Sequence, residues 1–139
     1  MNKKQEQFEW WITSVDEKIS NLKKKLPFEV IESLDKTIDS LDVIENFLIH
    51  NCNSTDKKID FELLDQAASY IAAVYKLNLK KSRWFIELDD ESSVFYNKPG
   101  LQTNSKIYFY PHSYVTAAIE RGKGNFISQV IKNHQKISD

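Results

Sequence analysis

Apolar residues recur with helical spacing most strongly in residues 61–79, where thirteen of nineteen positions are apolar. The polar positions fall on one narrow stripe, with Asp65 beside it: Glu62, Gln66, Ser69 and Lys76. Asp60 is the expected N-cap, and Ile59 with Leu63 would form a hydrophobic staple. No run of about 18 apolar residues occurs, so the pattern predicts a buried central helix and not a membrane span.

Helical spacing also predicts elements on both sides of this helix. Residues 4–25 read as one amphipathic helix, and Pro27 opens a short helical turn. Ser40 is the expected N-cap of a further helix, and the polar residues 50–58 are expected to form a surface loop. Two C-terminal helices are predicted, from about residue 113 to 121 and from 125 to about 135, separated by glycines.

The period changes to two after residue 79, which indicates strands. Three short aromatic segments alternate in this way: 83–88, 93–97 and 106–110. Residues 89–92 fit a hairpin turn, and 98–105 contain Pro-Gly and are predicted to be a loop. The expected fold is a single α+β domain over residues 1–139. A helical N-terminal half packs its central helix on a small three-stranded antiparallel sheet, and two C-terminal helices follow.

Composition narrows the classes of function. The 139 residues are 41% hydrophobic, which supports a packed core, and the net charge is −1. Only Arg83 and Arg121 are arginine among nineteen basic residues, so nucleic acid is a disfavoured partner. Cys52 is the only cysteine, and the N-terminal residues lack the apolar stretch of a secretory signal. We therefore expect a cytoplasmic protein without a membrane segment.

Residues that could carry chemistry do not form a recognised motif. His50 and Cys52 could make a nucleophilic pair, or bind zinc together with His112 and His134, but their spacing supports neither. The acidic run of residues 89–91 fits a solvated turn better than a cation site. We predict no catalytic residue, no metal and no cofactor.

The predicted strands carry aromatic residues on both faces. In residues 106–110, Tyr108 and Tyr110 oppose Phe109, and in residues 83–87, Phe85 opposes Trp84. Either helices cover both faces, or one face is an open surface. An open face with Tyr108 and Tyr110 would suit a protein partner or stack single-stranded bases.

Acidic residues are concentrated in residues 27–56. Seven acids stand there against one lysine, so this segment sums to 1 − 7 = −6, and the other residues must sum to +5. Such a segment can steer a basic protein partner. The candidate contacts are Glu32, Asp35, Asp39, Asp42 and Glu45.

Residues 60–131 combine several features in a fixed order. These are an Ala-rich helix with Tyr70, Ile71 and Val74, a strand opened by Trp84, a strand ending at Pro111, a helix closed by Ile119-Glu120-Arg121-Gly122, and an amphipathic helix. This pattern resembles small uncharacterised bacterial α+β proteins, some of which look like toxin-immunity proteins. Such proteins often have Gly-Glu where this chain has Ala72-Ala73. The resemblance implies a non-enzymatic protein and transfers no functional residues.

These observations lead to one expected function and one alternative. We expect a non-enzymatic protein-binding module, an immunity protein that neutralises a toxin acting in the cytoplasm, with a basic toxin domain as its partner. The alternative is a nucleic-acid or small-ligand binding module that uses the aromatic sheet face. An enzyme that uses His50 and Cys52 ranks last.

Overall fold

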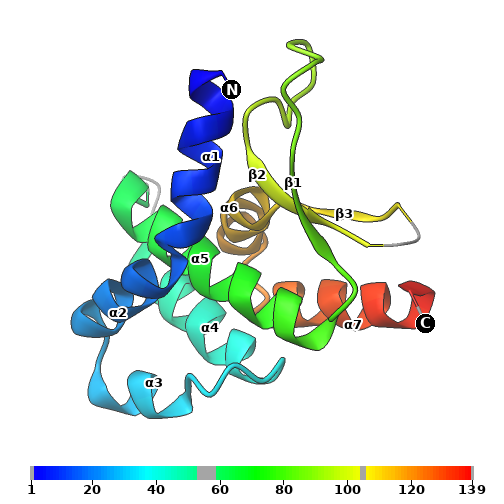
Figure 1. Cartoon of the computed structure of the whole chain (residues 1–139). Helices are drawn as coiled ribbons and strands as arrows, with labels where there is room; N and C mark the ends of the chain where they lie inside the picture. The colour runs from blue at the N-terminus through cyan, green and yellow to red at the C-terminus, as the bar shows by residue number, and fades with distance from the viewer. Residues whose placement is uncertain (1, 53–58, 104–105, 139) are drawn as a thin grey trace.

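The computed structural model describes residues 2–52, 59–103 and 106–138, which form seven helices and one three-stranded sheet (Figure 1). The elements follow in the order α1 Lys3–Thr13, α2 Val15–Lys25, α3 Phe28–Ser33, α4 Ser40–Cys52, α5 Phe61–Asn78, β1 Arg83–Ile86, β2 Pro99–Gln102, β3 Tyr108–Phe109, α6 Pro111–Arg121 and α7 Phe126–Ser138. The predicted α+β fold with a small antiparallel sheet is confirmed.

Helix α5 is the centre of the molecule, as its apolar pattern predicts. Nine of its residues are buried, and α2 and α6 pack along it. Asp60 is the N-cap, since its carboxylate accepts the backbone N–H of Leu63 at 2.8 Å. Figure 1 shows the sheet on one side of α5 and the helices α2, α3 and α4 on the other.

The single helix predicted over residues 4–25 is wrong in one respect, because the chain bends at Ser14. The Ser14 hydroxyl donates to the carbonyl of Trp11, and the Thr13 hydroxyl donates to the carbonyl of Trp10, both at 2.8 Å. These side chains compete with the helical backbone bonds and end α1. Helix α2 then leaves at a steep angle to α1 (Figure 1).

Ser40 is not an N-cap, which corrects the prediction for α4. It is the first residue of the helix, and its hydroxyl donates to the Thr37 carbonyl and lies 2.7 Å from the hydroxyl of Tyr70. Helix α4 continues to Cys52, so His50 and Cys52 are helical and not in the expected loop. The rest of that predicted loop, residues 53–58, lies outside the described residues.

The sheet has the predicted number of strands but a different middle strand. Residues 93–97 are not a strand and 89–92 are not a two-strand hairpin turn, because β2 is formed by residues 99–102, which were expected to be a loop. In the register of the sheet, Leu101 lies opposite both Trp84 and Phe109. Leu101 and Phe109 are fully buried, so this face of the sheet closes the core.

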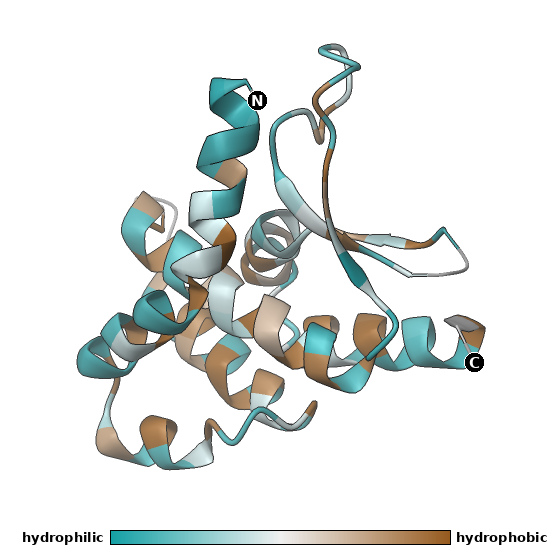
Figure 2. Cartoon of the chain, viewed as in Figure 1, coloured by the Kyte–Doolittle hydropathy of each residue, from teal (hydrophilic) through white to brown (hydrophobic). Residues whose placement is uncertain are grey.

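The two C-terminal helices are confirmed with shifted starts. Pro111 begins α6, since proline suits the first helical position, and Gly122 ends it with a φ of 64°. Helix α7 begins one residue after the predicted start. Figure 2 shows hydrophilic and hydrophobic residues mixed along α2 and α7, as expected for amphipathic surface helices.

Candidate functional site

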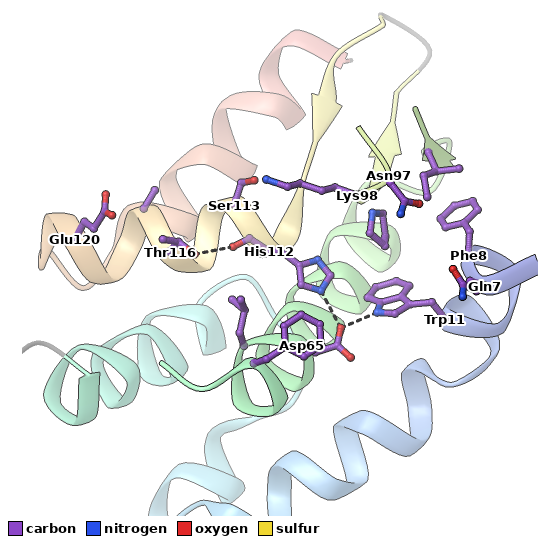
Figure 3. A pocket seen from close by; sticks show the side chains of 15 residues that line it. Gln7, Phe8, Trp11, Asp65, Asn97, Lys98, His112, Ser113, Thr116 and Glu120 are labelled. Atoms are coloured by element: carbon purple, nitrogen blue, oxygen red, sulfur yellow. Dashed lines mark hydrogen bonds and ion pairs between the residues drawn. The ribbon is translucent and has the colours of Figure 1, made fainter. Parts of the chain in front are cut away.

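A pocket of about 700 Å³ lies between α1, α5, α6 and the segment that leads into β2 (Figure 3). Its apolar lining includes Phe8, Trp11, Phe61, Leu64, Ile86 and Pro99. Its polar lining includes Gln7, Asp65, Asn97, Lys98, His112, Ser113, Thr116 and Glu120. A pocket of this size that combines apolar and aromatic walls with polar groups is typical of ligand sites in proteins.

The carboxylate of Asp65 lies at the base of this pocket and joins four helices. One of its oxygens accepts the indole N–H of Trp11 on α1 at 2.7 Å and lies 2.8 Å from Nε2 of His112 on α6. The other oxygen lies 2.9 Å from the amine of Lys18 on α2. Figure 3 shows Trp11 and His112 converging on the same oxygen of Asp65.

The Asp65 carboxylate stays ionised because its partners outweigh its burial. Burial by itself raises the pKa of this group, but the hydrogen bonds from His112, Trp11 and Lys18 and the charge of Lys18 together hold the pKa far below its usual range. The negative charge of Asp65 is therefore balanced locally by Lys18.

His112 is held in place by this carboxylate. Its Nε2 is engaged with Asp65, and its Nδ1 is buried without a hydrogen-bond partner in the part of the chain that the structure describes. The Asp65–His112 contact therefore joins α5 to α6 at the pocket wall.

A second histidine, His134, is half-buried near the sheet. Nδ1 of His134 on α7 is 2.8 Å from the Tyr75 hydroxyl, and Tyr75 stacks on Phe109 with ring centroids 4.3 Å apart. Burial lowers the pKa of His134, because the charged imidazolium is less well solvated there. This pair joins α5 to α7 and lies apart from the pocket lining.

The predicted acidic contacts differ in their exposure to solvent. Glu32, Asp35 and Asp39 are exposed, on α3 and in the segment before α4. Asp42 is half-buried and accepts the hydroxyl of Ser128. Glu45 is fully buried, so its prediction as a surface contact is wrong. Its carboxylate accepts backbone N–H groups at the start of α7, a role that charge counting does not reveal.

The two predicted aromatic contacts also differ in their exposure to solvent. Tyr108 is 39% exposed, whereas Tyr110 is only 8% exposed and is not available as a surface contact. The ring of Phe95 stacks on Tyr110 with centroids 4.0 Å apart, and Gly100 lies so close to the Tyr110 ring that a Cβ would be 2.8 Å from it. A base cannot stack on a ring that is occupied in this way, so the geometry disfavours the nucleic-acid alternative at Tyr110.

The remaining candidates for chemistry are not brought together. His50 is exposed and its Nδ1 lies 2.8 Å from the carbonyl of Asn46, while Cys52 is buried. Asp90 accepts the N–H and hydroxyl of Ser92 within its own turn. Over residues 2–52, 59–103 and 106–138, no three histidine, cysteine or acidic side chains are grouped to hold a metal ion.

Sequence reasoning weighed His112 only as a zinc ligand and did not bring it together with Asp65 and Trp11. Trp11 is 54 positions and His112 is 47 positions from Asp65 in the chain, so no local motif joins them. The available signal was the position of Asp65 at the border of the polar stripe of an otherwise buried helix. An acid in that position needs partners, because an unpaired buried charge is costly.

Comparison of the chain with protein-family models, curated proteins and solved structures finds no significant match. Among the described helices, none has both the length and the apolar character needed to cross a membrane.

Proposed function

We propose that this chain is a non-enzymatic protein-binding module, an immunity protein that neutralises a bacterial toxin in the cytoplasm. The observation that carries the proposal is an exposed acidic surface with an aromatic residue at its edge. Phe28 is 68% exposed at the start of α3. The exposed acids that follow it are Glu29, Glu32, Asp35 and Asp39, and we call these five residues the acidic face.

The acidic face is compatible with a basic partner. Among the residues that the structure describes, its one recorded ion pair is a loose contact of 3.9 Å between Asp39 and Lys132. The carboxylates are therefore available to attract a positively charged surface. An exposed aromatic residue beside them can serve as the apolar anchor of an interface, since aromatic residues are enriched in interface cores.

The segment that carries Asp35 and Asp39 is held to the core. Lys36 has a φ of 64°, and its backbone N–H donates to the Tyr70 hydroxyl at 3.0 Å. Asp35 accepts both the N–H and the hydroxyl of Thr37. A preformed surface loses less conformational entropy on binding than a flexible surface does, and this favours affinity.

A tagged pull-down from the native host, followed by mass spectrometry, tests the proposal. We expect one stoichiometric protein with a toxin-like domain, and co-expression of this chain should relieve its toxicity. Reversing Glu29, Glu32 and Asp39 to lysine should weaken binding at least about tenfold and flatten its dependence on salt.

The matched control reverses three exposed acids elsewhere, Glu9, Asp16 and Glu17, on α1 and α2. These changes add the same charge but leave the acidic face intact. If both triple variants bind with the same affinity and salt dependence, the acidic face is not the contact surface. If no protein is enriched, or if toxicity persists on co-expression, the immunity function is wrong.

A further inference from the structure

We propose that the pocket between α1, α5, α6 and β2 binds an aromatic group that carries a single anionic substituent. A free aromatic carboxylate and the C-terminal residue of a peptide share this chemistry. The inference is independent of the proposed function, because α3 and the acidic face do not line the pocket. Figure 1 shows α3 far from the sheet, whereas the pocket adjoins β1 and β2.

The walls of the pocket suit a flat apolar group. Phe8, Trp11 and Phe61 line it from α1 and α5, and Pro99 lines it from the strand side. Phe61 is 75% exposed although it lines the pocket, so its ring lies at the opening. Burying this aromatic surface against a ligand ring removes apolar area from water, and the stacked or edge-on contacts add to that gain.

The indole of Trp11 is fixed before any ligand arrives. Its N–H is bonded to Asp65, the amine of Lys18 lies 4.6 Å from its ring centroid, and Trp84 contacts it edge-on at 5.6 Å between centroids. A ligand therefore meets a rigid wall, and little side-chain entropy is lost on binding.

The charges of the lining select an anion at one end of the pocket. The charge of Asp65 is already balanced by Lys18. Lys98 is exposed and has no ion pair recorded within residues 2–52, 59–103 and 106–138. In Figure 3 its side chain reaches toward Ser113 on α6, whereas Glu120 lies at the other end of that helix. Residues 113 and 120 are separated by roughly 10 Å along a helix, so an anion at Lys98 avoids Glu120.

The backbone around Lys98 is also held in place. Asn97 has a φ of 58°, a conformation that asparagine tolerates better than most residues, and its N–H donates to the carbonyl of Glu87 at 2.8 Å. The Lys98 N–H donates to the carbonyl of Phe95 at 3.1 Å. The turn thus presents the lysine at the pocket without further ordering of the chain.

The test uses 2-naphthoate and its neutral isostere 2-naphthamide, observed by NMR through the tryptophan indole N–H signals. We expect 2-naphthoate to shift the Trp11 signal saturably and to leave the signal of Trp10, which is 73% exposed, unchanged. The amide should bind about two- to fivefold more weakly, because it lacks the ionic contact with the exposed Lys98. Lys98→Gln should abolish this preference, while Lys81→Gln, at an exposed site outside the pocket lining, should keep it.

A blocking variant tests the location. Ala117 lines the pocket and is half-buried, so Ala117→Phe should fill it and weaken both probes at least about tenfold. If this variant does not fold, Lys98→Gln and Lys81→Gln still test the anion preference. Both change exposed side chains and should leave the fold intact. Equal binding of acid and amide, an unchanged preference in Lys98→Gln, or no response of Trp11 would overturn the proposal.

The two sources of the ligand are separated by a peptide pair, acetyl-Gly-Gly-Phe with a free carboxylate and the same peptide as the amide. Tighter binding of the peptide acid than of 2-naphthoate assigns the site to chain termini. Binding of 2-naphthoate alone assigns it to a free small molecule. Both results support the proposal. It is contradicted if the peptide acid binds no better than the peptide amide and 2-naphthoate binds no better than 2-naphthamide.

Discussion

The carboxylate of Glu45 on α4 accepts the backbone N–H of Ile127 on α7 at 2.9 Å, although the two residues are 82 positions apart. Its second oxygen accepts the N–H of Phe126, also at 2.9 Å. The first N–H groups of a helix have no partner within the helix, and an anion there also meets the positive end of the helix dipole. Glu45 therefore caps α7 from another element.

Replacing Glu45 by alanine should lower the free energy of unfolding by about 3 kcal/mol, because one part-buried and one buried N–H group lose their acceptor. Glu45→Gln keeps one acceptor oxygen and should cost less. Urea denaturation followed by circular dichroism measures both, and Glu32→Ala, at an exposed position, is the control. A change in Glu45→Ala no larger than in that control would contradict the capping role.

Asp65 should make the stability of the protein sensitive to acid. Its pKa in the folded chain lies below the ordinary value of 3.8, so the unfolded chain binds this proton first as the pH falls. The stabilisation is thus complete at neutral pH and is lost below about pH 4 as the pH approaches the folded pKa. Asp65→Asn should be less stable at pH 7 and should lose less stability between pH 5 and 3.

Thermal unfolding at closely spaced pH values measures this difference. Asp16→Asn is the matched control, since Asp16 is exposed on α2. Parallel stability curves for wild type and Asp65→Asn over the acid range would show that the Asp65 hydrogen bonds contribute nothing to the acid response.

His134 should add a second dependence at higher pH. Burial lowers its pKa in the folded chain from the ordinary 6.5, so the unfolded chain binds a proton that the folded chain resists. Stability from this group is complete above about pH 6.5 and declines as the pH falls through the window below it. His134→Gln should flatten the curve between pH 7 and 5 relative to His50→Gln, a change at an exposed histidine. Equal slopes in the two variants would exclude His134 as the source.

Gly124 should not tolerate a side chain. Its φ is 92°, and a Cβ would lie 2.6 Å from Oδ1 of Asn46. Gly124→Ala should destabilise the protein by about 2 kcal/mol, from backbone strain and from the displaced asparagine. In an Asn46→Ala background the clash is gone and only the strain remains, so the cost should fall by about half. Chemical denaturation of the four proteins in this cycle gives the values.

The helices were predictable because their signal is local. Leu41, Ile44 and Leu48 repeat with the helical period and are all fully buried. The position of the middle strand was not predictable in this way, because strand pairing depends on residues far apart in the chain. Pro99-Gly100 reads locally as a turn, yet Gly100 belongs to the middle strand, where the ring of Tyr110 needs a residue without a Cβ.

In the candidate sites, too, local sequence signals do not reveal the contacts that the fold creates. The exposure of Asp39 and the burial of Glu45 could not be told apart from the sequence, since both are acids in one acidic segment. The partner that buries Glu45 is the N-terminus of α7, which the fold alone brings to α4. Likewise, Asp65 and His112 meet only because α5 and α6 pack together.

The bend at Ser14 has a consequence for the motions of the protein. Helix α1 begins before this bend and contributes Phe8 as its buried residue, with Trp11 bonded to Asp65. An element with so little buried apolar surface is expected to open locally, well before global unfolding, and its amide protons should exchange with solvent early. Phe8 and Trp11 are also pocket walls. A ligand in the pocket binds only the closed state, in which Phe8 and Trp11 are already in place, so it would slow that exchange by mass action.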